Sequence, residues 1–243
     1  MQTALSVLET RLCGNPQQAA CVERRQLVTF LNPYSYLIAR KNIAVLSQFD
    51  TVCVDGLLLL LLLKACGFRI KQRISFDYTS IANAVLTAAC AQHKSVFFVG
   101  SHDETIKKFV AHIEDQYPNL VITGYSGGYF SSNTTRANTL NAIAKQRPDI
   151  VICGMGTPLQ EQFLVDLSAT GWAGTGYTCG GFIHQTASKN GLYFPHWINK
   201  LQLRFLFRLY KEPALWRRYV LEYPKIIPAL LYDRLRYHRV PKS

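Results

Sequence analysis

Several features that mark whole classes of protein are missing from this sequence. The seven cysteines are odd in number and form no Cys-x-x-Cys pair, and most of them lie within apolar runs. This pattern argues against a disulfide framework or a zinc site and favours reduced core residues in a cytosolic protein. Charged residues make up only 17% of the chain and hydrophobic residues 49%, which excludes a disordered protein.

No stretch of the chain is apolar for long enough to cross a membrane. The most apolar run is seven leucines, residues 57–63, which lie between Asp55 and Lys64, whereas a spanning helix needs roughly 20 apolar residues. We therefore expect these leucines to form a helix that is buried on all sides. The N-terminus contains no basic leader followed by an uninterrupted apolar core, so we expect no signal peptide.

Acidic residues are scarce, and the resulting positive charge is uneven. The chain has 15 Asp and Glu against 27 Lys and Arg, which gives a net charge of +12. Residues 200–243 contain 11 of the basic residues and three acidic ones, so they carry +8 of that charge. We therefore divide the chain into an α/β domain, residues 1–199, and a basic appendage, residues 200–243.

Short apolar runs alternate with helical segments along the first part of the chain. The runs predicted to be strands are residues 26–31, 51–54, 95–99, 120–123, 149–153 and 176–179. Helices are predicted between them, for example one that ends near Arg40 and others at residues 78–92 and 133–145, and Ser101 with Glu104 has the spacing of a helix capping box. This alternation predicts the α/β class, with a doubly wound, mostly parallel, Rossmann-like sheet.

The stretch around residues 154–156 joins a predicted strand to a helix through a Gly-Met-Gly turn. Thr157 and Gln160 have the spacing of a second capping box, and Pro158 fits the first helical position. Such a turn directs backbone N–H groups and the positive end of the helix dipole toward one point, which suits a phosphate. The alternative is a well-capped turn that binds no ligand.

Other predicted strands also end in polar residues or glycines. Asn32 follows the first strand, Asp55 follows the second, and Gly180 and Gly181 follow the last. Because open parallel sheets bind ligands beyond the carboxyl ends of their strands, these residues predict a ligand crevice. Asn32 is either a ligand contact or a turn residue, and Asp55 is either a general base or a helix cap.

Taken in this order, the motifs resemble the WecG/TagA/CpsF family of bacterial glycosyltransferases, glycosyltransferase family 26. The similarity extends over about residues 25–220. The matching residues include Val54-Asp55-Gly56, Gly127-Gly128-Tyr129-Phe130, Gly154-Met155-Gly156-Thr157-Pro158-Leu159-Gln160-Glu161, Gly180-Gly181 and Phe207-Arg208-Leu209. The resemblance implies that a sugar passes from a nucleotide diphosphate, usually UDP, to a lipid-linked acceptor, with inversion and without a metal or other cofactor.

The same resemblance implies roles for individual residues. Asp55 matches the proposed general base, Asn32 and Gln160 lie beside it, and Arg208 matches an arginine of the appendage that closes over the donor. No Asp-x-Asp occurs in the sequence to hold a divalent ion, so we expect the helix N-terminus and arginines to stabilise the departing diphosphate. The predicted substrate contacts are Arg73, Tyr129, Gly154, Gly156, Thr157, Gly180, Gly181 and His184.

Some positions depart from the family pattern. His184 stands where an Asp often follows the Gly-Gly pair, and Tyr193-Phe194-Pro195 replaces Arg-Ala-Pro. These changes fall where donor and acceptor would be recognised, so the resemblance implies the type of reaction and leaves the sugar open.

The C-terminal segment interleaves arginines with aromatic residues. A basic, amphipathic segment of this kind suits the headgroup region of an anionic membrane. Nucleic acid would be attracted by the same charge, but no recognition motif accompanies it, so we predict no nucleic-acid partner. The remaining alternative is a pair of surface helices whose aromatic residues pack on the α/β domain. The predicted membrane contacts are Trp216, Arg217, Arg218, Arg234 and Arg236.

Together these features predict an inverting, metal-independent glycosyltransferase that is bound peripherally to the inner face of the cytoplasmic membrane. Its predicted substrates are a UDP-sugar donor and a polyprenyl-diphosphate-linked sugar acceptor in bacterial surface polysaccharide synthesis, and a homo-oligomer is left open. The alternative is a non-catalytic nucleotide-binding regulatory or interaction protein of the same fold. A Rossmann-type oxidoreductase is disfavoured, because no acidic residue ends the strand expected to hold a ribose.

Overall fold

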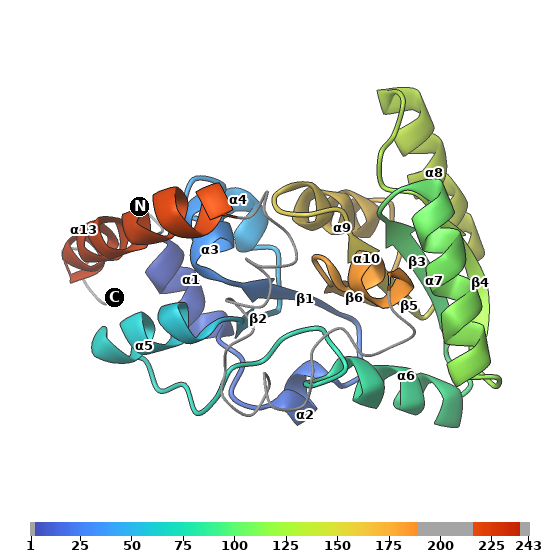
Figure 1. Cartoon of the computed structure of the whole chain (residues 1–243), viewed down its shortest axis with the longest axis horizontal. Coiled ribbons are helices and arrows are strands. Elements are labelled where there is room, and N and C mark those ends of the chain that lie inside the picture. The colour runs from blue at the N-terminus through green and yellow to red at the C-terminus, as the bar shows by residue number, and fades with distance from the viewer. Residues whose placement is uncertain (1–2, 189–215, 239–243) are drawn as a thin grey trace.

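A six-stranded parallel sheet forms the centre of the molecule, with strand order β2-β1-β6-β5-β3-β4 (Figure 1). The computed structural model describes residues 3–188 and 216–238. The strands are β1 (Gln26–Leu31), β2 (Thr51–Val54), β3 (Ser95–Gly100), β4 (Val121–Ser126), β5 (Ile150–Gly154) and β6 (Thr175–Thr178). Each coincides with a predicted strand to within a few residues, so the predicted α/β class is confirmed. The predicted residues Tyr193-Phe194-Pro195 and Arg208 lie outside the described residues.

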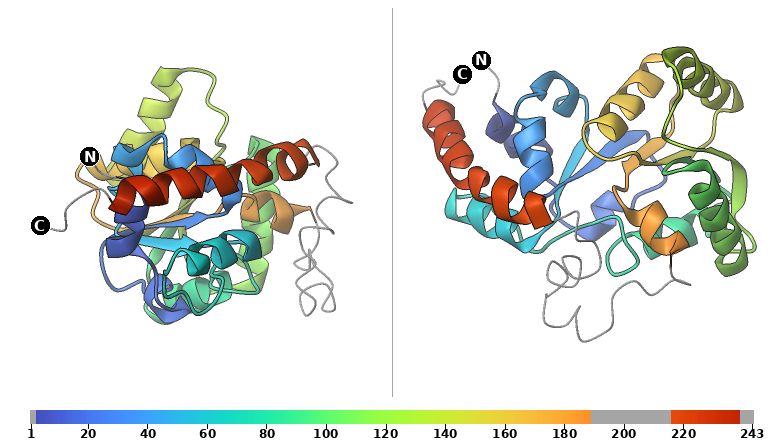
Figure 2. Two further views of the ribbon diagram at one scale, coloured as in Figure 1. Left: turned by 90° about the vertical axis from the view of Figure 1, so that its left-hand side faces the viewer. Right: turned by 45° about the horizontal axis from the view of Figure 1, so that its top comes forward.

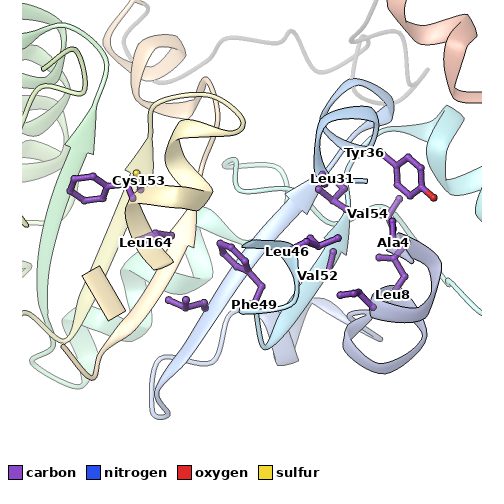
Figure 3. Packing of buried hydrophobic residues seen from close by; sticks show 14 of the residues in the cluster. Ala4, Leu8, Leu31, Tyr36, Leu46, Phe49, Val52, Val54, Cys153 and Leu164 are labelled. Carbon is purple, nitrogen blue, oxygen red and sulfur yellow. The ribbon is translucent and has the colours of Figure 1, made fainter. Parts of the chain in front are cut away.

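Side chains alternate between the two faces of the sheet, and each face is covered by its own helices. Along β1, Leu27 and Leu31 belong to one buried cluster and Val28 and Phe30 to the other. The first cluster, part of which appears in Figure 3, includes residues of α1 (Ala4–Arg11), α3 (Pro33–Ala39), α4 (Ile43–Leu46), α5 (Leu57–Ala65), α8 (Asn133–Gln146), α9 (Leu159–Ala169) and α13 (Ile226–His238). The second includes residues of α2 (Pro16–Ala19), α6 (Ala82–Ala91), α7 (Asp103–Gln116) and α10 (Phe182–Ala187). Helices on both faces are the doubly wound arrangement that the sequence predicts.

The leucine helix differs from its prediction. Leu59, Leu60 and Leu63 of α5 are buried, but Leu57 is 50% exposed and Leu61 is 53% exposed. The prediction of a helix buried on all sides is wrong, because α5 follows the edge strand β2 and packs on the sheet with one face only. Within the described ranges, no helix combines the length and apolarity needed to span a bilayer.

The two predicted capping boxes are also wrong. Pro158 occupies the N-cap position of α9, after a cis Thr157–Pro158 peptide bond, and no side chain caps that helix. The Thr157 hydroxyl instead donates to a buried carboxylate, that of Glu161. The helix α7 has His102 at its N-cap, also without a side-chain cap, because Ser101 adopts a left-handed conformation (φ 60°) in the turn after β3.

The boundaries of two other elements differ from the prediction. The predicted helix over residues 78–92 begins at Ala82, because Asp77 accepts from the Thr79 N–H and holds residues 77–80 in a turn. The fourth strand continues to Ser126, so the predicted glycine-rich loop begins only at Gly127.

A buried polar cluster fastens α13 to the α/β domain. The Asp233 carboxylate is buried and accepts from Arg40 Nε at 2.8 Å, from Arg40 Nη2 at 2.6 Å and from the Tyr36 hydroxyl at 2.9 Å. Burial and the neighbouring Asp233 carboxylate raise the pKa of Tyr36, which therefore remains a hydrogen-bond donor. The bidentate arginine pair fixes the orientation of α13 against α3.

Substitution of Asp233 with Ala should lower the free energy of unfolding by about 3–5 kcal/mol, because it leaves the Arg40 charge partly buried without its partner. Urea denaturation measures this loss, and limited proteolysis should cleave α13 faster than in the wild type. Asp115, which is exposed on α7, provides the matched control, and Asp115→Ala should change the stability by less than about 0.5 kcal/mol. Equal effects of the two substitutions would show that the Asp233 cluster does not hold α13.

Candidate active site

Six parallel strands deliver the segments that follow them to one edge of the sheet (Figure 1). In open α/β sheets ligands bind at this edge. The structure therefore brings most of the predicted site residues to the same side of the molecule. The segments are Asn32 after β1, Asp55 after β2, Ser101-His102 after β3, Gly127-Gly128-Tyr129 after β4, Met155-Gly156-Thr157 after β5 and Gly180-Gly181 after β6.

Asp55 lies at this edge as one half of an ion pair. Its Oδ1 atom is 2.9 Å from Arg73 Nη1, and both side chains are partly exposed. Arg73 reaches this position because the next residue, Ile74, donates its N–H to the Val54 carbonyl at the end of β2. The guanidinium holds the carboxylate in one orientation and compensates its charge. The structure thus joins two residues that the sequence assigned separately, one as a base and one as a diphosphate contact.

Asn32 is the immediate neighbour of Asp55 across the β1–β2 pair. The Asp55 N–H donates to the Leu31 carbonyl at 2.8 Å, so the residues after the two strands lie side by side. The Asn32 Oδ1 atom accepts from the Ser35 N–H at 3.0 Å and caps α3. Its amide N–H groups make no hydrogen bond to the residues that the structure describes, so they are available to a ligand.

The glycines after β5 and β6 have different roles. A Cβ atom on Gly154 would lie only 2.8 Å from the Cys179 sulfur, so this glycine is required for packing between the two strand ends. Gly156 (φ 75°) and Gly180 (φ 54°) have the left-handed conformation that favours glycine, and a Cβ atom on either would meet none of the residues described in the structure within 4 Å. Their backbones therefore border open space, where a ligand can approach closely.

Gln160 connects the two glycine turns and is not exposed to the crevice. Its side chain is buried, its Oε1 atom accepts from the Gly180 N–H at 3.1 Å, and its Nε2 atom donates to Glu161 at 2.9 Å. Both ends of the amide are thus occupied by protein groups. Gln160 fixes the Gly180 turn to α9, whereas the sequence predicted that it would lie in the pocket beside Asp55.

Glu161 is a buried carboxyl group beneath these turns. Its Oε1 atom accepts from Gln160 Nε2, from the Thr157 hydroxyl at 3.1 Å and from the Thr29 hydroxyl at 3.4 Å. Its Oε2 atom is buried and has no hydrogen-bond partner within the described part of the chain. Burial raises the pKa of this carboxyl group, and the hydrogen bonds to Oε1 only partly offset the effect.

Glu161 has no role of its own among the residues predicted from the sequence. A glutamate in the first turn of a helix is ordinarily a surface residue, and the partner Thr29 lies on a strand 132 residues away. The available signal was an acidic residue directly after Gln160 in the shared Gly-x-Gly-x-Pro-x-Gln-Glu motif.

Tyr129 and His102 form an aromatic pair at the other end of the edge. Their rings stack with centroids 4.2 Å apart and planes 17° apart, and Tyr129 is 70% exposed. Since β4 and β2 are the outer strands of a six-stranded sheet, their ends are roughly 24 Å apart at about 4.8 Å per strand. Tyr129 and Asp55 are therefore too far apart to contact the same group of a ligand.

The helix after the last strand carries one more of the predicted site residues. His184 lies on the exposed side of α10, the helix that follows Gly180-Gly181, and Arg208 lies outside the described residues. Over residues 3–188 and 216–238, no three or more His, Cys, Asp or Glu side chains are grouped closely enough to hold a metal ion.

The raised pKa of Glu161 predicts a specific dependence of stability on pH. The folded state holds this proton more tightly than the unfolded chain, so wild-type stability falls as pH rises from the ordinary glutamate pKa through the raised value. Glu161→Gln cannot ionise, so its stability relative to the wild type should increase over that range by up to about 1.4 kcal/mol per pH unit. Urea denaturation at several pH values measures the difference. Glu114→Gln on exposed α7 is the control, and parallel curves for wild type and Glu161→Gln would contradict the assignment.

Comparison with known proteins identifies the family. Residues 6–240 match the glycosyl transferase WecG/TagA/CpsF family. The chain is 37% identical over 209 residues to a UDP-Gal:alpha-D-GlcNAc-diphosphoundecaprenol beta-1,4-galactosyltransferase of Shigella boydii, covering 86% of this chain and 87% of that protein. It is also 29% identical over 211 residues to an N-acetylglucosaminyldiphosphoundecaprenol N-acetyl-beta-D-mannosaminyltransferase of Bacillus subtilis (strain 168), covering 85% and 79%. The chain is therefore a glycosyltransferase and belongs to the WecG/TagA/CpsF family.

Proposed function

We propose that this enzyme transfers a sugar from a UDP-sugar, with inversion and without a metal ion, to a polyprenyl-diphosphate-linked N-acetylglucosamine. The observation that carries the proposal is the partly exposed Asp55 carboxylate, which is paired with Arg73 at the strand edge where the glycine turns leave open space. Such a carboxylate suits a general base, because it can accept a proton from a sugar hydroxyl that is bound beside it.

In the proposed reaction Asp55 removes the proton of the acceptor hydroxyl. The hydroxyl oxygen attacks the anomeric carbon of the donor on the side opposite to the diphosphate, and the bond between that carbon and the diphosphate breaks. The proton remains on Asp55 and the electron pair leaves with UDP. Two named relatives support inversion, because both are described as forming beta linkages, whereas the common UDP-hexoses of this kind carry the diphosphate in the alpha configuration.

The departing diphosphate needs positive groups to stabilise its developing charge. The turns at Gly156 and Gly180 border the open space, and α9 begins directly beyond the first of them. The positive end of that helix supplies part of the stabilisation. Thr157 contributes through its backbone, since its hydroxyl is bound to Glu161. Arg73 and Arg208 are the proposed cationic groups.

The donor nucleoside is proposed to bind toward the His102–Tyr129 pair. A stacked, exposed aromatic pair can bind the face of a nucleobase. The separation of the outer strand ends is compatible with this position of the nucleoside. The glycine turns then remain for the diphosphate, and the Asp55 end remains for the acceptor. UDP-galactose is the first donor to test, on the basis of the 37% identical relative.

The lipid of the proposed acceptor implies that the enzyme works at the inner face of the cytoplasmic membrane. Trp216 is exposed near the start of the described C-terminal segment, and Arg217 and Arg236 are exposed on it. Exposed aromatic and basic residues of this kind favour peripheral binding to an anionic surface.

Asp55→Asn should reduce the turnover number by about 10²–10⁴-fold, because the amide cannot accept the proton. The affinity for UDP, measured by calorimetry, should stay within a few-fold of the wild-type value. The turnover assay uses UDP-[³H]galactose and a GlcNAc-diphosphate-lipid acceptor in excess EDTA, and wild-type activity should persist there. Asp115→Asn is the control. If Asp55→Asn turned over as fast as the wild-type enzyme, Asp55 would not be the base. If EDTA abolished the activity of the wild-type enzyme, the proposed metal independence would be contradicted.

A further inference from the structure

We propose that the side-chain N–H groups of Asn32 recognise the 2-acetamido group of the acceptor sugar and so select N-acetylglucosamine over glucose. This role rests on the proposed function, in which the acceptor binds at the Asp55 end of the crevice. The two ends of the Asn32 amide have different tasks. The oxygen caps a helix, and the nitrogen is left for a ligand.

The first turn of α3 holds the Asn32 side chain in one orientation. The Oδ1 atom of Asn32 accepts from the Ser35 N–H at 3.0 Å, and the Asn32 N–H donates to the Ser35 hydroxyl at 2.7 Å. An amide nitrogen cannot accept from a backbone N–H, so the capping bond identifies which end of the amide is the oxygen. The Nδ2 group is the other end of the planar amide and takes no part in the cap.

The two hydrogens of Asn32 Nδ2 are unused in the part of the chain that the structure describes. Side-chain atoms that are buried there without a hydrogen-bond partner are His112 Nε2 and Glu161 Oε2, and Asn32 Nδ2 is not among them. The nitrogen is therefore open to solvent, in agreement with the partial exposure of Asn32. A donor group that is fixed in place and open to solvent suits an acceptor oxygen of a ligand.

The Asn32 side chain lies beside the proposed base. A Cβ atom on Gly56, the residue after Asp55, would lie 3.8 Å from the Asn32 Cβ atom. Because β1 and β2 are paired, the residues that follow them are separated by about one strand spacing, roughly 4.8 Å. A sugar ring that presents one hydroxyl to Asp55 can therefore reach Asn32 with a substituent on another carbon.

The acetamido group is the part of the acceptor that the two named relatives have in common. Both are described as acting on N-acetylglucosamine linked to diphosphoundecaprenol, although one transfers galactose and the other N-acetylmannosamine. The acetamido carbonyl accepts hydrogen bonds, and Asn32 has only donors left to offer. The 2-hydroxyl of glucose ends closer to the ring, so a glucose acceptor would leave these donors without their partner, and a site built around a hydrogen bond rejects such an analogue.

The far end of α3 is anchored, which keeps Asn32 in position before the acceptor binds. The helix α13 packs against α3 (Figures 1 and 2), and Asp233 accepts from Tyr36 and from Arg40. Pro33 occupies the first turn of α3 directly after Asn32. Little side-chain freedom is therefore lost when the amide binds a ligand.

The test compares two acceptors that differ only at carbon 2, GlcNAc-diphosphate-lipid and glucose-diphosphate-lipid, with UDP-galactose as the donor. Wild-type enzyme should prefer the GlcNAc acceptor by about 100-fold in kcat/KM. Asn32→Asp keeps an oxygen for the Ser35 N–H but has no donors, so the preference should fall to within a few-fold of unity. The added charge beside Asp55 lowers turnover on both acceptors, so the ratio of the two kcat/KM values is the readout.

Two further variants complete the test. Asn32→Ser also retains a capping oxygen, adds no charge and removes the amide donors, so it should lose the preference as well. Asn15→Asp is the matched control, because Asn15 caps α2 in the same way, with Oδ1 accepting from the Gln18 N–H at 2.8 Å. Its preference should equal that of the wild type, and thermal melts should show that all variants are folded.

The outcomes separate this role from the proposed function. An unchanged ratio in Asn32→Asp and Asn32→Ser would overturn the assignment, even if both variants turned over slowly, because a purely structural role lowers transfer to both acceptors alike. Equal use of the two acceptors by the wild-type enzyme would overturn it too, and would leave the proposed transfer intact. If wild-type enzyme transferred galactose to neither acceptor, the proposed function would be contradicted and the role of Asn32 with it.

Discussion

The parallel pairing of β1 with β2 on one side and β6 on the other is the constraint on which the site depends. It places Asn32, Asp55 and the Gly180 turn at successive positions along one edge. Because every strand runs in the same direction, the segment that follows each strand adds its residues to this edge. These segments contribute no residues to the opposite edge. The chemistry is thus assembled from segments that are far apart in the sequence, and the buried sheet fixes their spacing.

A buried polar network makes the spacing rigid where the ligand is proposed to bind. Glu161 and Gln160 connect α9 to Thr29 on β1 and to the Gly180 turn after β6. The Gln160 amide and the Glu161 Oε1 atom are hydrogen-bonded within the protein, so these two side chains position the backbone that borders the crevice. At the other end of α3, the Asp233 cluster attaches α13, which belongs to the proposed membrane-binding segment. The same fold therefore links the reaction edge to the proposed membrane surface.

The sequence predicted the six strands because buried parallel strands are continuous apolar runs, and it predicted the edge because Gly, Asn and Asp follow those runs. It did not predict the exposed side of α5, because seven identical leucines carry no periodicity from which a buried face can be inferred. The prediction that Thr157 caps α9 was wrong because its hydroxyl donates to Glu161, four residues further along, and the burial of Glu161 depends on strands elsewhere in the chain. Likewise, the Asp55–Arg73 pair depends on a loop that returns beside β2.

The central claim is that the reaction is a single displacement on the donor carbon by an acceptor hydroxyl that a protein carboxylate has deprotonated. The most direct measurement is the anomeric configuration of the new glycosidic bond, determined by NMR of the disaccharide that wild-type enzyme makes from UDP-α-galactose. We predict a β linkage. An α linkage would show retention and would contradict the account.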